Sequence, residues 1–159
     1  MEPPSSRNIT VINESERAIR QARLIQAMCG AFRRHGKPDA KVCLLLTTDE
    51  RVRELNRQFR GVDESTDVLT FPAGEFAGEL LGDVAISVPY AERQARLRKV
   101  SLTQELGYLA IHGALHLVGF DDETEPERAE MVRQMNIVAL DAGLKPDEHW
   151  ASILHGEAR

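Results

Sequence analysis

The sequence predicts a single α+β domain in which a mixed sheet of about four strands packs against about five helices. Its 159 residues, 42% of them hydrophobic, suffice for one domain with its own core. No repeat and no linker rich in Gly, Ser or Pro divides residues 1–159, so they are expected to form one unit. The expected elements follow the order β-α-β-α-β-β-α-α-α, and strands that do not alternate strictly with helices favour a mixed sheet.

Two pairs of a strand and a helix are expected in the first part of the chain. A β-branched run predicts a strand at 8–12, and apolar residues at helical spacing predict a helix over 13–34 that opens on an Asn-x-x-Glu pattern. Residues 42–46 are apolar on both alternating faces, as in a strand in the middle of a sheet. A Thr-x-x-Glu capping box and a terminal glycine bound the second helix, expected over 47–61.

Two further strands and three helices are expected in the rest of the chain. Alternating apolar residues predict strands at 67–71 and 82–88, which a loop containing two glycines connects. A proline suited to the first turn opens a helix expected over 89–99. Capping boxes then open two helices, expected over 101–119 and 124–143, and each ends at a glycine.

The ends of the chain and its charge set expectations for location and partners. Residues 1–7 are expected to form a loose N-terminal tail without the apolar stretch of a signal peptide, and no later run suits a membrane helix, so a cytoplasmic protein is expected. Residues 120–159 carry ten acidic and four basic side chains, and they include an acidic C-terminal tail at 145–159. The rest of the chain carries 15 acidic and 16 basic side chains. An RNA substrate is therefore compatible with the net charge of −5, although a long electrostatic grip on a duplex is disfavoured.

The residues with the strongest chemical signal lie at the end of the penultimate helix. His112 and His116 are four residues apart, so a helix places both rings on one face. Gly119 lets the chain turn back, which brings Asp122 within reach of an ion held by the two rings. Three protein ligands leave one vertex of a zinc tetrahedron for water, as in catalytic zinc sites. The spacing thus predicts a catalytic metal site in a hydrolase.

One residue argues against a zinc peptidase. The spacing His-x-x-x-His-x-x-Gly-x-x-(His or Asp) is also that of metzincin peptidases, which need a glutamate directly after the first histidine as the general base. That position is Gly113 in this chain. A zinc metallopeptidase-like hydrolase therefore remains as an alternative that lacks its proton acceptor.

Residues 112–122 resemble the YbeY family of bacterial zinc endoribonucleases, whose motif is His-Gly-x-Leu-His-Leu-x-Gly-(Phe/Tyr)-Asp-His, at ten of the eleven positions. Residues 56–72 are similar to the family's segment that ends in Thr-Asp-Val-Leu-Ser-Phe-Pro, and residues 81–87 supply a third match. The resemblance implies a single-strand-specific, metal-dependent endoribonuclease that acts in small-subunit rRNA maturation and ribosome quality control. The partners that it implies are single-stranded RNA, rRNA and small-subunit components of the ribosome, without membrane or DNA.

The resemblance also implies roles for individual residues. The family's third histidine ligand is replaced by Asp122, so we expect one zinc ion on His112, His116 and Asp122, with another divalent metal as an alternative. Asp121 is expected to orient a ligating histidine without contacting the ion, and the alternative is that Asp121 itself is the third ligand. Arg60 matches the arginine that the family places near the metal, and we expect it to act in catalysis as a donor to the scissile phosphate. The nucleophile stays open between a water and a ribose hydroxyl, and the general base is not identified.

A hypothesis of a different class also stays open. In a non-catalytic ribosome assembly factor, the metal would only hold the last two helices together. The open fourth vertex favours an enzyme, whereas the replacement of the third histidine by Asp122 favours the assembly factor.

Overall fold

One mixed sheet of four strands lies at the centre of the structure, a computed structural model that describes residues 8–151. The strands are, in chain order, β1 (Ile9–Asn13), β2 (Lys41–Thr47), β3 (Val68–Pro72) and β4 (Leu80–Ser87). They lie side by side in the order β1-β2-β4-β3. The β1–β2 and β2–β4 pairs are parallel, whereas β3 and β4 are antiparallel. The order of strands and helices along the chain confirms the predicted mixed α+β fold.

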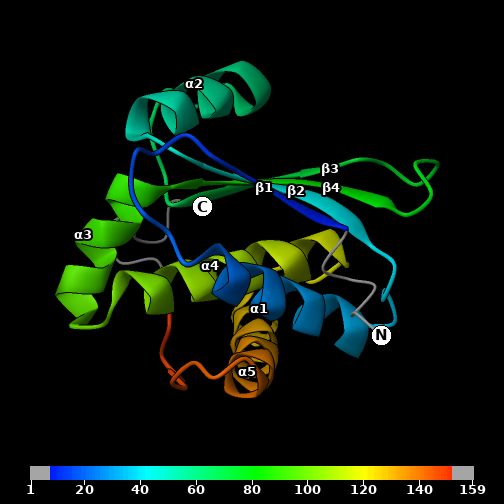
Figure 1. The fold of residues 1–159 in the computed structure, drawn as a ribbon. Helices are drawn as coiled ribbons and strands as arrows, with labels where there is room; N and C mark the ends of the chain where they lie inside the picture. The colour runs from blue at the N-terminus through cyan, green and yellow to red at the C-terminus, as the bar shows by residue number, and fades with distance from the viewer. Residues whose placement is uncertain (1–7, 152–159) are drawn as a thin grey trace.

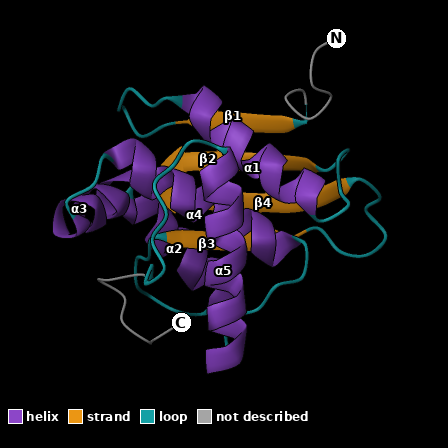
Figure 2. Ribbon diagram, turned by 90° about the horizontal axis from the view of Figure 1, so that it is seen from below, coloured by secondary structure: helices purple, strands orange, loops and turns teal. Residues whose placement is uncertain are grey.

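The helices cover the two faces of the sheet unequally. Within the described residues they are α1 (Gln21–Arg34), α2 (Asp49–Arg60), α3 (Val88–Arg98), α4 (Leu102–Leu117) and α5 (Glu125–Asp141). Figure 1 shows α1, α4 and α5 below the sheet and α2 alone above it. Seen from below in Figure 2, α5 lies outermost and crosses the direction of the strands, and α4 lies between α5 and the β3–β4 part of the sheet. In the part of the chain that the structure describes, no helix is both long and apolar enough to cross a membrane.

The core lies between the sheet and α4, which is buried without interruption from Glu105 to Leu115. Such a helix has no solvent face along its middle turns, because the sheet lies on one side and α1, α3 and α5 contact the others. The approach to the sheet is closest at Gly113. A Cβ atom at this position would lie 2.7 Å from Cγ1 of Val84 on β4 and 3.4 Å from Cγ2 of Thr70, the residue paired with Val84 on β3. A residue larger than glycine would require the Val84 side chain or its strand to shift.

The first helix begins later than predicted. We expected a helix from residue 13, whereas α1 begins at Gln21. The Asn13 side chain instead accepts hydrogen bonds from the backbone nitrogen and the hydroxyl of Ser15, at 3.0 and 2.6 Å. Glu16 then adopts a positive φ of 64°, which interrupts any helical path. Asparagine satisfies local backbone donors in turns as well as at helix starts, so the Asn-x-x-Glu pattern was misleading here.

The predicted start of α2 was wrong by one residue. Thr48, not Thr47, caps this helix and accepts a hydrogen bond from the backbone nitrogen of Arg51. The Thr47 hydroxyl is buried and donates to Oε1 of Glu14 at 2.6 Å, so it connects β2 to the segment after β1. The end of α2 at Gly61, with φ at 71°, is confirmed.

The capping boxes predicted for the last two helices have different outcomes. At α5 the box is complete, because Thr124 and Glu127 bond to each other's backbone nitrogens. At α4 the Ser101 side chain caps the helix as expected, but the side chain of Gln104 bonds to the backbone of Lys145. This contact ties the segment after α5 to the start of α4.

The first part of the predicted acidic tail, residues 145–151, packs against the body of the protein. The Tyr108 hydroxyl donates to the carbonyl of Lys145 at 2.9 Å, and Trp150 is 5% exposed. Residues 1–7 and 152–159, which include the predicted N-terminal tail and the end of the acidic tail, lie outside the described residues.

We expect Gly113→Ala to lower the free energy of unfolding by about 1–2 kcal/mol. Overpacking a core position typically costs about 1–3 kcal/mol, and the better helix propensity of alanine returns at most about 1 kcal/mol. Gly30→Ala in α1 is the matched control, because its new Cβ would lie 3.6 Å from Val138, an ordinary contact. Urea unfolding should show the control to be stabilised by about 0.5–1 kcal/mol. Equal stabilisation by both substitutions would contradict close packing at Gly113.

Candidate metal centre

The candidate metal ligands lie where α4 emerges from the core. His112 and His116 lie one turn apart on α4, and the chain reverses at Gly119, whose φ of 108° suits only glycine. The reversal is held by hydrogen bonds from the backbone nitrogen of Gly119 to the His116 carbonyl and from that of Phe120 to the Leu115 carbonyl, at 3.1 and 3.0 Å. Asp122 is thereby returned to the two rings, as the spacing in the sequence predicts.

The distances between the three side chains suit one metal ion. Nε2 of His112 lies 3.1 Å from Nε2 of His116, and Oδ2 of Asp122 lies 3.5 Å from each of these nitrogens. For ligand bonds of about 2.0–2.1 Å, the ligands of a tetrahedral ion are roughly 3.3–3.4 Å apart. Two imidazoles and a carboxylate suit zinc and other transition metals, whereas magnesium and calcium prefer oxygen ligands throughout. This group of His112, His116 and Asp122 could therefore hold a metal ion.

The hydrogen bonds of His116 favour the protonation state that a metal needs. Its Nδ1 lies 2.9 Å from the carbonyl oxygen of Phe120, and a carbonyl can only accept, so Nδ1 carries the proton. Nε2 then carries the lone pair that a metal ion would bind, and it is the atom directed at His112 and Asp122. The turn that returns Asp122 therefore also orients the second histidine.

The cluster formed by His112, His116 and Asp122 borders a small pocket, which Arg60 also lines. The pocket has a volume of about 150 Å³ and is lined by Arg60, Val68, Thr70, His116, Asp122 and Glu123. Arg60 comes from the last turn of α2 and donates from Nη2 to the backbone carbonyl of Thr70 at 3.2 Å. The structure thus brings Arg60 to the cluster across the edge of β3. Asp121, in contrast, is exposed and is not part of the group of three.

Two side chains that the sequence did not single out, Trp150 and Arg98, pack beside His112. The ring of Trp150 lies against that of His112, with centroids 5.4 Å apart, and the guanidinium of Arg98 lies over the indole at 5.0 Å. Arg98 also contacts the buried carboxylate of Glu105, with 2.8 Å between Nε and Oε1. The segment after α5 therefore contributes directly to the packing of one candidate ligand.

Glu105 is part of a buried polar network. Its Oε2 accepts a hydrogen bond from Nε2 of Gln94 at 3.0 Å, and the same amide lies 3.4 Å from Oδ2 of the fully buried Asp67. Burial raises the pKa of Glu105 to about 7, although the guanidinium of Arg98 acts in the opposite direction. The network links α3, α4 and the start of β3 behind the candidate site.

The comparisons with known proteins agree with the motifs. The sequence profile of the family described as "Endoribonuclease YbeY" matches residues 8–141. The chain belongs to the YbeY family. The matched region contains all the candidate ligands, as well as Arg60 and the Glu105 network.

Relatives in the YbeY family cover different shares of the chain. A protein of Desulfitobacterium hafniense called "Endoribonuclease YbeY" is 40% identical over 144 residues, which are 84% of this chain and 92% of the relative. One of Desulforamulus reducens with the same name is 45% identical over 102 residues, 59% of this chain and 67% of the relative. For several relatives the match spans slightly less than two thirds of their length. The solution structure of TM1509 from Thermotoga maritima has a TM-score of 0.58 and 28% identity, and the match covers 84% of this chain and 90% of that one.

We expect the carboxylate of Asp122, rather than that of Asp121, to be needed for metal binding. Asp122→Ala should lower the zinc content of the purified protein or weaken its zinc affinity by roughly 10-fold or more, because an anionic ligand is lost. Asp121→Ala, the matched control one residue away, should change affinity less, since its side chain is exposed. Metal analysis and competition with a chromogenic chelator measure both variants. Normal metal content in Asp122→Ala together with loss in Asp121→Ala would reverse the assignment.

Glu105 should make the protein less stable as the pH rises from about 4.5 to about 7. In this window the folded protein keeps the Glu105 proton that the unfolded chain has lost, so the free energy of unfolding decreases by about 3 kcal/mol through this group. Glu105→Gln removes the titration but keeps a polar side chain of similar size. Urea unfolding at a series of pH values should therefore show a smaller decrease for the variant. Equal pH dependence in the two proteins would mean that Glu105 titrates normally.

Proposed function

We propose that this protein is a metal-dependent endoribonuclease that cuts single-stranded RNA, with zinc held by His112, His116 and Asp122. The observation that carries the proposal is the position of Arg60, which lines the same pocket as two of the three candidate ligands. A phosphodiester is the substrate that suits both a metal ion and a permanently charged guanidinium. Membership of the YbeY family, whose profile is described as an endoribonuclease, supports the same chemistry.

His116, Arg60 and Asp122 have different roles in the proposed cleavage of a phosphodiester. A bound metal supplies Lewis acidity to a phosphoryl oxygen and lowers the pKa of a coordinated water. His116 is held in the tautomer that presents Nε2 by its bond to the carbonyl of Phe120. Arg60 is oriented beforehand by the carbonyl of Thr70, so it can stabilise the charge that develops on the phosphate without reorganisation. Asp122 adds negative charge beside the ion, which should make it a weaker Lewis acid than a site with three neutral histidines.

The packing at Gly113 favours RNA over a peptide as substrate. A peptidase of similar ligand spacing needs a glutamate at this position. Here a Cβ atom would already meet Cγ1 of Val84 at 2.7 Å, so the position is directed at the sheet and has no room for a longer side chain. Cleavage of small-subunit rRNA, contact with ribosomal components and a cytoplasmic location remain predictions that rest on the family.

Cleavage of RNA should depend on the metal cluster. We expect zinc-loaded protein to cut single-stranded rRNA fragments, and expect EDTA treatment or His116→Ala to abolish cutting. Casein and duplex RNA of the same sequence serve as comparison substrates. Cleavage of casein would point to a peptidase, and tight RNA binding without cleavage would point to an assembly factor. The chemistry of the cut ends then separates the two nucleophiles, because a ribose hydroxyl leaves a cyclic phosphate.

Arg60→Ala should lower kcat for RNA cleavage by roughly 100-fold or more, as expected when a donor to the transition state is removed. Arg60→Lys should recover only part of the rate, because lysine keeps the charge but loses the planar fork. Arg57→Ala is the matched control. It lies one turn earlier on α2, is exposed, and pairs with Glu54 on the same helix. An equal loss of rate in Arg57→Ala and Arg60→Ala would mean that Arg60 contributes only positive charge and has no specific position at the phosphate.

A further inference from the structure

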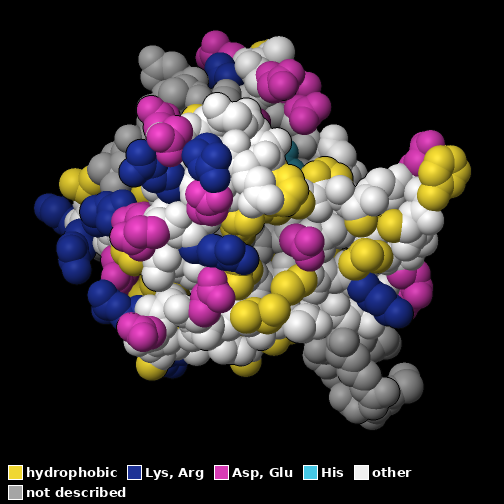
Figure 3. Space-filling view, turned by 90° about the horizontal axis from the view of Figure 1, so that it is seen from above, with side chains coloured by type: hydrophobic (Ala, Val, Ile, Leu, Met, Phe, Trp, Pro, Cys, Tyr) yellow, Lys and Arg dark blue, Asp and Glu magenta, His cyan; other side chains and the backbone are white. Residues whose placement is uncertain are grey.

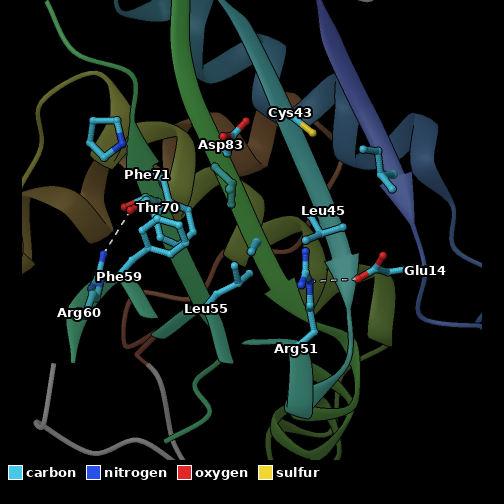
Figure 4. A pocket seen from close by; sticks show the side chains of 14 residues that line it. Glu14, Cys43, Leu45, Arg51, Leu55, Phe59, Arg60, Thr70, Phe71 and Asp83 are labelled. Atoms are coloured by element: carbon cyan, nitrogen blue, oxygen red, sulfur yellow. Dashed lines mark hydrogen bonds and ion pairs between the residues drawn. The ribbon is translucent and has the colours of Figure 1, made fainter. Parts of the chain in front are cut away.

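A large groove lies on the face of the sheet that α2 only partly covers. It has a volume of about 850 Å³. Its apolar floor and walls include Leu45 of β2, Ala85 of β4, and Leu55 and Phe59 of α2. Figure 4 labels Leu45 of β2 and Leu55 and Phe59 of α2, and it shows Phe71 of β3 beside Phe59. The face seen in Figure 3 carries hydrophobic side chains near its middle, with charged side chains gathered mainly to one side.

An aromatic side chain stands at the mouth of this groove with most of its surface in solvent. Phe59 belongs to the apolar stripe of α2, yet it is 62% exposed, whereas Val52 on the same stripe is fully buried. The ring of Phe59 contacts that of Phe71 in an edge arrangement, with centroids 5.4 Å apart and 64° between the planes. This contact favours one orientation of Phe59 and leaves much of the ring available to another planar group.

The groove and the metal pocket are neighbours that share two residues. Arg60 and Thr70 line both, and Figure 4 shows Arg60 beside Phe59 and bonded to Thr70. A phosphate held by Arg60 at the metal pocket would therefore lie next to the opening of the groove. In a nucleic acid strand, the group attached one sugar away from that phosphate is a base.

The charges in the groove suit a base better than a sugar–phosphate backbone. Asp83 is exposed in the middle of the sheet face, and Glu14 lines the far side, where Arg51 lies 3.8 Å from its carboxylate. Carboxylates repel phosphates, but they accept hydrogen bonds from the amino groups and ring N–H groups of bases. An apolar groove with acceptors on its floor and an aromatic ring at its mouth matches the two faces and the edge of a nucleobase.

We propose that this groove is a nucleobase subsite. It takes one unpaired base of single-stranded RNA, adjacent to the phosphate at Arg60, and stacks this base on Phe59. The inference rests on the proposed RNA substrate and assigns to it a site that the metal chemistry does not require. Because a base inside a duplex is stacked and paired, it would have to leave its helix to enter the groove. The groove thereby supplies a physical reason for selecting single strands.

A thermodynamic cycle between the protein and the RNA tests this subsite. Full-length protein is kept in EDTA to prevent cleavage, and its affinity for an end-labelled single-stranded RNA of about eight nucleotides is measured by fluorescence anisotropy. One abasic ribose is moved along the RNA, and each RNA is bound to the unmodified protein and to Phe59→Ala. At one position the missing base should weaken binding by about 10-fold, in the range known for base–aromatic stacking. In Phe59→Ala the intact RNA should bind about 10-fold more weakly. An abasic ribose at the sensitive position should then weaken binding no further.

Two further variants separate stacking from general effects. Phe59→Trp should keep the affinity and the position dependence, whereas Phe76→Ala should leave both unchanged, because Phe76 is 95% exposed and does not line the groove. If no abasic position is sensitive to Phe59, the nucleobase subsite is wrong, even where metal-loaded protein cleaves RNA normally. Conversely, a Phe59-dependent position in a protein that cleaves no RNA would support the subsite and overturn the proposed nuclease.

Discussion

The continuous burial of α4 determines where the two candidate histidine ligands are accessible. From Glu105 to Leu115 the helix lies inside the molecule, and at Gly113 a Cβ atom would meet the Val84 side chain of β4 at 2.7 Å. Beyond this buried stretch the helix becomes accessible again in its last turn, which carries His116. His112, one turn earlier, is held in the core with only one side of its ring toward the cluster. A rigid, buried element thus presents the two rings with little freedom, as preorganised metal sites require.

The unequal coverage of the sheet follows from the same arrangement. With α1, α4 and α5 on one face, the hydrophobic core is complete there, and the opposite face has only the short helix α2. Its strand residues Cys43 and Leu45 stay partly accessible, and the charged Asp83 is tolerated in the middle of the sheet. One face therefore provides stability and the other provides an accessible surface, with Arg60 at the boundary between the groove and the metal cluster.

Local patterns in the sequence predicted what local geometry determines. The order of elements, the ends of α2 and α4, and the group of His112, His116 and Asp122 depend on spacing within one or two turns, and the structure brings these three side chains together. The predicted start of α1 was wrong because Asn13 forms an Asx turn with the same side-chain atoms that can cap a helix. The other features that the sequence did not predict are contacts between segments far apart in the chain.

The contact of Trp150 with His112 and the Glu105 network join residues from α3, α4 and the segment after α5, and no periodicity in the sequence encodes these neighbours. The exposure of Phe59 was equally hidden, because an apolar stripe on α2 predicts a buried face, and only the fold shows that the groove beside it is open. A buried acid such as Glu105 was recognisable in the sequence only as one more polar residue in an apolar helix.

The position of Trp150 gives the protein an intrinsic optical probe. It is the one tryptophan in the chain, so emission excited at the indole band comes from a single, buried fluorophore. That fluorophore lies against the ring of His112 and under the guanidinium of Arg98, so a change at either group alters its surroundings. Because His112 is a candidate metal ligand, an ion bound there is expected to change the emission of Trp150, which can be followed in unlabelled protein.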